Sequence, residues 1–249
     1  MRIFGLIGFP LGHSFSAGYF SEKFSREGIA DAEYRNFPID KIDKFPSLIN
    51  DNPELKGLNV TIPYKEQVVQ FLDELDEKTR AIGAVNTIKI ENNQKKITLK
   101  GFNTDEYGFR TSLLPHLNEN RKKALILGTG GASKAVKFVL DDLDINWMEV
   151  SRKPKSDKSI GYEEINEEII REYTIIINTT PLGMHPDIYS FPPLPYKHMN
   201  ANHLAFDLVY NPTVTTFMKK ASEQGATIVN GLKMLELQAE KAWEIWNRK

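Results

Sequence analysis

Runs of consecutive apolar residues alternate along the chain with segments in which apolar residues recur every three or four positions. The first pattern is typical of strands buried in a parallel sheet, and the second is typical of helices that cover such a sheet. In the N-terminal part the pattern predicts strands over 3–8, 34–39 and 57–63, a helix capped by Ser16 that runs to about Gly28, and helices over 41–49 and 64–75. Three strand–helix units in a row predict a small α/β sheet.

A hairpin is predicted next, with strands over 84–91 and 97–102 around Asn92-Asn93, and it would add edge strands to this sheet. A helix over 104–114 then leads to a polar, basic connection. A second series follows, with strands over 124–127, 147–151, 174–178, 204–210 and 226–230 and helices over 132–143, 213–223 and 232–248. The chain is therefore predicted to form two α/β blocks that meet near 102–105.

Glycines separate the strand over 124–127 from the helix that follows it. Gly128, Gly130 and Gly131 are followed by Ala132 and Ser133. A strand that turns through glycine into a helix leaves backbone N–H groups at the positive end of the helix dipole, where a phosphate binds well. The spacing is a variant of the dinucleotide-binding fingerprint. An ordinary glycine-rich turn is the alternative interpretation.

The end of the next strand bears on which dinucleotide would bind. An acidic residue there accepts hydrogen bonds from a free ribose 2′-hydroxyl and favours NAD. This strand ends in Ser151, Arg152 and Lys153, with Lys155 close behind, and such a cationic end favours the 2′-phosphate of NADP. Glu149 is predicted to lie on the same face as Ser151, deeper along the strand. The alternative is that Arg152 and Lys153 belong to a solvated loop.

Polar side chains gather where the strands of the first block end, which is where ligands bind in open parallel sheets. They are Ser14, Ser16, Asn59, Thr61, Lys65, Asn86, Asn103, Thr104 and Asp105. Hydroxyls, amides, one amine and one carboxylate suit a small polyhydroxylated anion. Ser16 and Asp105 could instead only cap helices, and Lys65 could be a solvated cation, although the first turn of a helix disfavours lysine. The pattern contains no metal-ligand spacing, so no metal is predicted.

Composition and net charge limit the classes of partner that can be expected. The 249 residues are 41% hydrophobic, carry a net charge of −1 and include no cysteine. A near-neutral chain gives no electrostatic reason to expect a nucleic-acid or membrane partner. The N-terminus enters a strand pattern directly, and its apolar run is short for a signal peptide. A cytoplasmic protein, monomeric or homodimeric, is expected.

Seven segments in order along the chain resemble the signature motifs of the shikimate dehydrogenase family. They are 12–16 (GHSFS), 58–65 (LNVTIPYK), 83–87 (GAVNT), 101–105 (GFNTD), 128–133 (GTGGAS), 178–184 (NTTPLGM) and 207–212 (DLVYNP). Two departures accompany the resemblance. The family usually has proline after Ser16 and His-Asn a little later, where this chain has Ala17 to Ser21. It also has Asn-Arg-Thr at the strand end where this chain has Ser151-Arg152-Lys153.

The resemblance implies an N-terminal substrate-binding domain (1–102, joined by the C-terminal helix 232–249), a Rossmann-like NADP-binding domain (103–231), and a cleft between them. It implies reversible reduction of 3-dehydroshikimate to shikimate, a step of chorismate and aromatic amino acid biosynthesis. The implied catalytic residues are Lys65 and Asp105. The implied substrate residues are Ser14, Ser16, Asn59, Thr61, Asn86, Tyr210 and Gln238. The implied cofactor residues are Gly128, Gly130, Gly131, Ala132, Ser133, Ser151, Arg152, Lys153, Thr179, Leu208 and Gly231.

Lys65 is the predicted proton donor to the ketone oxygen, since that oxygen must gain a proton as the hydride arrives. Asp105 is predicted to hold Lys65 in place and to bind a ring hydroxyl. A positive helix end would lower the pKa of Lys65 and Asp105 would oppose that. Two alternatives stay open: a relative that also accepts quinate or NAD, and a non-catalytic ligand sensor. Retention of Lys65 and Asp105 argues against the sensor.

Overall fold

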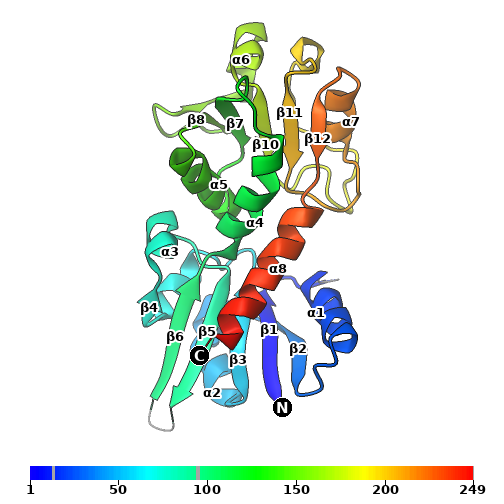
Figure 1. The fold of residues 1–249 in the computed structure, drawn as a ribbon. Helices are drawn as coiled ribbons and strands as arrows, with labels where there is room; N and C mark the ends of the chain where they lie inside the picture. The colour runs from blue at the N-terminus through cyan, green and yellow to red at the C-terminus, as the bar shows by residue number, and fades with distance from the viewer. Residues whose placement is uncertain (13–14, 94–95, 249) are drawn as a thin grey trace. The chain divides into compact units, whose positions relative to one another are not determined.

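The computed structural model describes residues 1–12, 15–93 and 96–248 (Figure 1). By its internal contacts the chain divides into two compact units. Unit 1 comprises residues 1–104 and 238–249, and unit 2 comprises residues 105–237. The predicted substrate residue Ser14 lies outside the described residues, as does His13. No helix in the described part of the chain combines the length and apolarity needed to cross a membrane.

Unit 1 is built on a six-stranded sheet of order β2-β1-β3-β5-β6-β4. The strands are β1 (Arg2–Gly8), β2 (Ala32–Pro38), β3 (Leu55–Val60), β4 (Glu74–Leu75), β5 (Thr87–Asn93) and β6 (Lys96–Phe102). β1 pairs in parallel with β2 and β3, whereas β5 pairs antiparallel with both β3 and β6. The mostly buried β1 and β3 lie inside the sheet, as their continuous apolar runs predict.

Helices connect these strands. They are α1 (Phe15–Arg26), η1 (Ile42–Lys44), α2 (Phe45–Asp51), η2 (Gln67–Phe71) and α3 (Glu77–Ile82). The short α3 was not predicted. Its Asp76 N-cap accepts a hydrogen bond from the Thr79 N–H, and its last turn closes on Gly83 in the left-handed conformation (φ 70°). This turn sends the chain directly into the segment that carries Asn86.

Three local predictions for unit 1 are wrong. The predicted helix over 64–75 is replaced by the 3-10 turn η2 and the two-residue strand β4. Ser16 is not an N-cap, because α1 begins at Phe15 and Ser16 lies within its first turn. The predicted hairpin forms, but its strands are not at the edge of the sheet, because β4 pairs with the outer side of β6. The turn was also misplaced, since Asn92 and Asn93 lie in β5 and pair with Ile97 and Lys96.

Unit 2 contains a second six-stranded sheet, of order β12-β11-β10-β7-β8-β9, in which all pairs are parallel. Its strands are β7 (Lys123–Leu127), β8 (Asn146–Val150), β9 (Ser159–Ile160), β10 (Ile175–Asn178), β11 (Leu204–Asp207) and β12 (Thr227–Val229). Its helical segments are α4 (Thr104–Leu113), η3 (Leu114–His116), α5 (Gly131–Asp142), η4 (Tyr162–Glu164), α6 (Glu167–Glu172), η5 (Tyr196–His198) and α7 (Thr216–Ser222). Of these elements, β9, η4, α6 and η5 were not predicted.

The last helix, α8 (Leu232–Asn247), contributes to both units. Met234 near its start belongs to the core of unit 2, whereas the segment from Gln238 onward belongs to unit 1. There Trp246 packs in a cluster with Phe4 and Phe20. The two-block α/β organisation expected from the sequence is confirmed.

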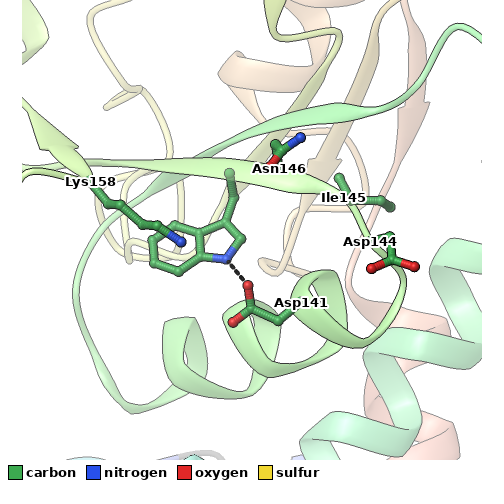
Figure 2. Close-up of a pocket in the computed structure, with 6 residues that line it drawn as sticks. Asp141, Asp144, Ile145, Asn146 and Lys158 are labelled. Atoms are coloured by element: carbon green, nitrogen blue, oxygen red, sulfur yellow. Dashed lines mark hydrogen bonds between the residues drawn. The ribbon is translucent and has the colours of Figure 1, made fainter.

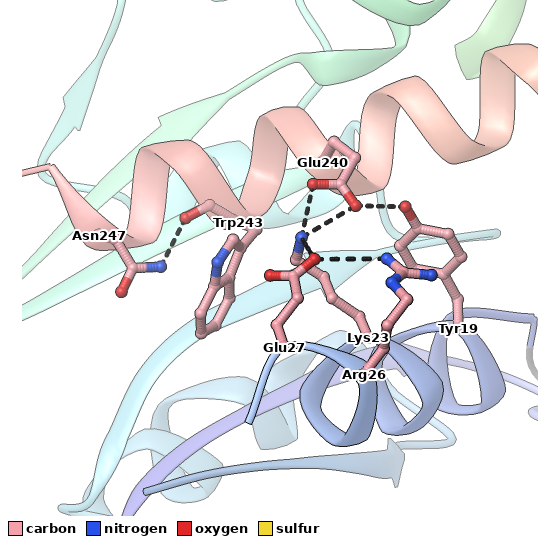
Figure 3. A network of polar contacts seen from close by, with 7 residues as sticks. All are labelled: Tyr19, Lys23, Arg26, Glu27, Glu240, Trp243 and Asn247. Atoms are coloured by element: carbon pink, nitrogen blue, oxygen red, sulfur yellow. Dashed lines mark hydrogen bonds and ion pairs between the residues drawn. The ribbon is translucent and has the colours of Figure 1, made fainter. Parts of the chain in front are cut away.

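A polar network fastens α8 to α1 inside unit 1 (Figure 3). The Lys23 ammonium from α1 is bonded to both carboxylate oxygens of Glu240 from α8, over 3.0 and 2.7 Å, and to Glu27 over 2.8 Å. The Tyr19 hydroxyl donates to the same Glu240 carboxylate. Lys23 is 4% exposed, and these carboxylates raise its pKa against the opposing effect of burial. The charge therefore stays in place at neutral pH and joins the two helices.

Candidate active site

Three amide side chains from distant parts of the sequence share one hydrogen-bonded network in unit 1. The Asn59 amide donates to the Asn86 backbone carbonyl over 3.4 Å, and the Asn86 amide donates to Gln238 Oε1 over 3.1 Å. Asn59 and Asn86 are 6% and 2% exposed. Buried amides need partners, so this network fixes the orientation of all three groups.

Tyr34 on β2 extends the network toward α1. Its hydroxyl donates to Asn59 Oδ1 over 2.8 Å and lies near the Ser16 side chain. Its ring stacks on Phe20, with 4.6 Å between centroids. Burial raises the pKa of Tyr34, so the hydroxyl remains a donor. The sequence identified Tyr34 only as a strand residue, because nothing local to it signals a bond to Asn59.

The side-chain oxygen of Asn86, Oδ1, caps α4. It accepts from the Thr104 N–H over 2.7 Å and from the Thr87 hydroxyl over 3.2 Å. Asp105 follows in the first turn of α4 and is 5% exposed. A carboxylate is favoured at this position by the positive end of the helix dipole. Asn86 therefore connects the amide network to the segment that carries the predicted catalytic carboxylate.

Lys65 lies in the loop after β3, near the end of the sheet. The Thr61 N–H donates to the Ile7 carbonyl over 2.9 Å, and the Val85 N–H donates to the Lys65 carbonyl over 2.7 Å. These bonds hold the Lys65 backbone beside the Gly83–Thr87 segment. Because η2 begins only at Gln67, Lys65 does not occupy the first turn of a helix. The helix end that the sequence predicts at Lys65 is therefore not among the described elements.

In unit 2 the glycine turn follows β7 as predicted. Gly128 has φ 107°, and a Cβ placed on it would lie 2.9 Å from the Thr179 hydroxyl oxygen. Gly130 is the N-cap of α5, which begins at Gly131. The backbone N–H groups of this turn can therefore approach a phosphate without a side chain between them. The Ser133 hydroxyl is buried and donates to the Gly130 carbonyl over 2.7 Å, so it stabilises the turn itself.

The other predicted cofactor residues follow neighbouring strands of the same sheet. The Thr179 hydroxyl donates to the Leu127 carbonyl over 2.7 Å, and the Leu208 N–H donates to the Asn178 carbonyl over 3.0 Å. A Cβ on Gly231 would lie 2.1 Å from the Leu208 carbonyl oxygen, so only glycine fits there. Thr179, Leu208 and Gly231 thus lie at the carboxyl edge of the sheet, where dinucleotides bind.

A cavity of about 590 Å³ opens at the end of β8, inside unit 2. Its lining residues are Thr129, Glu149, Ser151, Arg152, Lys153 and Lys155. The Ser151 hydroxyl oxygen accepts from the Lys153 N–H over 3.1 Å, which shapes the turn beyond the strand. The basic side chains of Arg152, Lys153 and Lys155 are exposed. A cavity with this lining is suited to a phosphate group.

A second cavity, of about 350 Å³, lies where α5 leads into β8 (Figure 2). The Trp147 indole N–H donates to Asp141 Oδ1 over 2.8 Å, and the Lys158 ammonium lies 4.8 Å from the ring centroid. This cavity is at the amino end of β8, away from the glycine turn. It therefore does not belong to the candidate dinucleotide site.

Asp207, a buried carboxylate at the end of β11, forms hydrogen bonds that hold the loop after this strand. Asp207 accepts from the Val209 N–H over 3.0 Å, from the Asn178 amide over 2.9 Å and from the Thr215 hydroxyl over 2.5 Å. It is fully buried, and desolvation raises its pKa to about 6 although these donors oppose the rise. Tyr210, a predicted substrate residue, follows in the same loop and is half-buried.

We expect Asp207 to make stability depend on pH. Its pKa is higher in the folded than in the unfolded chain, so its contribution is complete below about pH 4 and is lost as pH rises through about 6. Relative to an Asp207→Asn variant, the wild type should lose up to about 3 kcal/mol of unfolding free energy across this window. Urea unfolding of both proteins at a series of pH values measures the difference. If the wild type instead gained stability relative to Asp207→Asn as pH rises, the hydrogen bonds to the carboxylate would outweigh its desolvation.

In the part of the chain that the structure describes, no group of three or more histidine, aspartate or glutamate side chains could hold a metal ion. What the fold does provide is a glycine turn on a parallel sheet in one unit and a polar amide network in the other. This combination defines the chain as a two-unit, dinucleotide-binding α/β protein of the dehydrogenase class.

Comparison with known proteins makes the class specific. Residues 6–88 match the model of the shikimate dehydrogenase substrate binding domain. The shikimate dehydrogenase (NADP(+)) of Methanococcus maripaludis is 37% identical, over 98% of this chain and 91% of that protein. The crystal structure of shikimate dehydrogenase 1 from Peptoclostridium difficile matches with a TM-score of 0.85 at 37% identity, over 99% of this chain and 91% of that one.

A further solved structure is the shikimate 5-dehydrogenase of Thermus thermophilus in complex with NADP(H) and shikimate. It matches with a TM-score of 0.85 at 29% identity, over 99% of this chain and 93% of that one. The chain belongs to the shikimate dehydrogenase family.

Proposed function

We propose that this protein is an NADP-dependent shikimate dehydrogenase that reversibly reduces 3-dehydroshikimate to shikimate. The observation that carries the proposal is the network of Asn59, Asn86 and Gln238, which gathers amide groups from β3, the segment before β5, and α8. A site built to hydrogen-bond several hydroxyls discriminates strongly against analogues that lack them. The family relationship supports the same substrate class.

The residues present fit a bound NADP. The glycine turn at Gly128 and Gly130 would take the pyrophosphate, and Thr179, Leu208 and Gly231 lie at the sheet edge beside it. Ser151, Arg152 and Lys153 would contact the 2′-phosphate of the adenosine ribose. When bound, the reduced cofactor supplies the hydride for the ketone carbon.

We assign the proton to Lys65 and the supporting carboxylate to Asp105. Reduction leaves negative charge on the ketone oxygen, and a protonated lysine within reach neutralises it by donating a proton. In the reverse direction the neutral amine accepts that proton from the hydroxyl. Asp105 would hold the ammonium and bind a neighbouring ring hydroxyl.

The remaining polar groups would position the ring. Ser14 and Ser16 are assigned to the substrate carboxylate, and Asn59, Thr61, Asn86, Tyr210 and Gln238 to the hydroxyls. Holding the ring in one orientation converts an encounter into an effectively intramolecular reaction. The hydrogen bond from Tyr34 to Asn59, with Ser16 nearby, supports part of this preorganisation.

The proposal includes a cytoplasmic location and a monomeric or homodimeric chain that acts on small molecules. The net charge of −1 supplies no attraction to nucleic acid or to anionic membranes. Sedimentation of the purified protein would distinguish monomer from homodimer.

A spectrophotometric assay tests the function directly. Purified protein with shikimate and NADP⁺ should form NADPH, with a larger kcat/KM than for any other pairing of shikimate or quinate with NADP⁺ or NAD⁺. A preference for quinate or NAD⁺ would assign the chain to a relaxed relative. Binding of shikimate without turnover would identify a ligand sensor instead.

A further inference from the structure

One acidic side chain stands in the wall of the basic cavity at the end of β8. Glu149 lines this cavity together with Ser151 and Arg152. An acidic group at the end of this strand in a dinucleotide-binding fold accepts hydrogen bonds from a free ribose 2′-hydroxyl and repels a 2′-phosphate. Left alone, Glu149 would therefore oppose the preference for NADP that the neighbouring cations create.

The fold places a cation from another element against this carboxylate. Lys137 on α5 forms an ion pair with Glu149 Oε1, and that oxygen is buried. The two side chains are 25% and 12% exposed. At such limited exposure, solvent screens the pair much less than it screens a surface ion pair.

The position of Lys137 is fixed by a second contact. Its ammonium lies 5.3 Å from the centroid of the Trp147 ring, and Trp147 is held to α5 by its bond to Asp141. Because residues two apart in a strand share a face, Trp147 and Glu149 project from the same face of β8, and Ser151 follows directly after the strand. Lys137 thus bridges from the indole to the carboxylate, and the carboxylate is neutralised where the cavity begins.

We propose that Lys137 is a specificity-determining residue: by pairing with Glu149 it removes an acceptor for the 2′-hydroxyl of NAD and leaves a net positive cavity for the 2′-phosphate of NADP. Arg152, Lys153 and Lys155 then act on the phosphate without an opposing charge. This inference rests on the proposed function, because it explains how the same site selects its nucleotide.

The test is a double-mutant cycle on Lys137 and Glu149. We expect Lys137→Met to expose the carboxylate and to lower the ratio of NADP⁺ to NAD⁺ affinity by at least about tenfold, which corresponds to about 1.4 kcal/mol. Glu149→Gln alone should keep or increase the preference for NADP⁺. The double variant should recover the wild-type ratio, because no charge is then left to mask. Titration calorimetry with each nucleotide gives the dissociation constants without turnover.

Lys158→Met is the matched control, since Lys158 also lies over the Trp147 ring but is not the cation paired with Glu149 in the ion pair described above. Its affinity ratio should stay within about twofold of the wild type, a free-energy change well below the tenfold step. Equal ratios in Lys137→Met and in the double variant would overturn the proposal, because the effect would then not pass through Glu149. An unchanged ratio in Lys137→Met would overturn it too. If wild-type protein binds nucleotide but never oxidises shikimate, the proposed function fails while this cycle still decides the role of Lys137.

Discussion

Replacing Lys65 with alanine is expected to lower kcat by at least ~100-fold, the usual scale of a positioned general acid or base. The binding of NADP⁺ should stay near normal, because Lys65 belongs to unit 1 whereas the glycine turn belongs to unit 2. Steady-state kinetics with shikimate and direct titration of NADP⁺ measure the two effects separately.

Lys65→Arg distinguishes proton transfer from charge alone. Arginine keeps the positive charge but does not give up its proton at accessible pH. If Lys65 shuttles the proton, the arginine variant should be nearly as slow as the alanine variant. If it recovers most of the wild-type rate, Lys65 acts only as a positioning charge. Lys44→Ala removes an exposed lysine of the same unit, paired with Asp40, and should leave kcat unchanged. Wild-type turnover in Lys65→Ala would remove Lys65 from the mechanism.

The sequence carried most of the architecture because the strands of both sheets are dominated by consecutive apolar residues. In β7 and β10 this pattern has one low-energy solution, a parallel strand covered on both faces. The glycine turn was equally predictable, because Gly128 adopts a conformation that other residues rarely reach and Gly130 caps the following helix.

The segment 64–75 shows why other local predictions fail. Its apolar residues have helical spacing, yet tertiary packing overrides that preference. Leu75 pairs with Gly101 across β4 and β6, and the side chains of Leu72 and Leu75 come within 2.6 and 2.7 Å of the position of a Gly101 Cβ. Gly101, which is distant in the sequence, therefore leaves the space that Leu72 and Leu75 fill, and residues 74–75 pair as β4 where a helix was predicted. The residues near Lys65 in the sequence do not reveal this contact with Gly101.

For the candidate site, too, local sequence patterns predicted residue types, whereas long-range packing decides their contacts. Asn59 and Asn86 were predicted from the polar pattern and Gln238 from the family resemblance, but the bonds between them depend on how β3, the segment before β5, and α8 assemble. Tyr34 could not be identified at all, since its role depends on contacts with Ser16 and Asn59. Residue types are visible in a sequence, whereas their partners at long range follow only from packing.

Trp246→Ala is expected to be the most destabilising single truncation in unit 1, lowering the free energy of unfolding by about 3–5 kcal/mol. Trp246 is 6% exposed, and its indole N–H donates to the Ile88 carbonyl over 2.9 Å. Its ring stacks on Phe4 at 4.9 Å and fills the space above Gly57, where a Cβ would lie 2.2 Å from the indole nitrogen. The truncation leaves a cavity and an unpaired carbonyl, and the surrounding strands cannot collapse into it.

The truncation should also weaken substrate binding, because Trp246 anchors the helix whose Gln238 is hydrogen-bonded to Asn86. We therefore expect Trp246→Ala to raise the KM for shikimate more than the KM for NADP⁺. Trp243→Ala on the same helix is the matched control, since Trp243 is only partly buried and should cost less stability. Urea unfolding and steady-state kinetics of both variants give the comparison. Equal losses of stability in the two variants would contradict this prediction. They would show that α8 is held by its general apolar contact with unit 1, and not specifically by the Trp246 indole packed against Gly57.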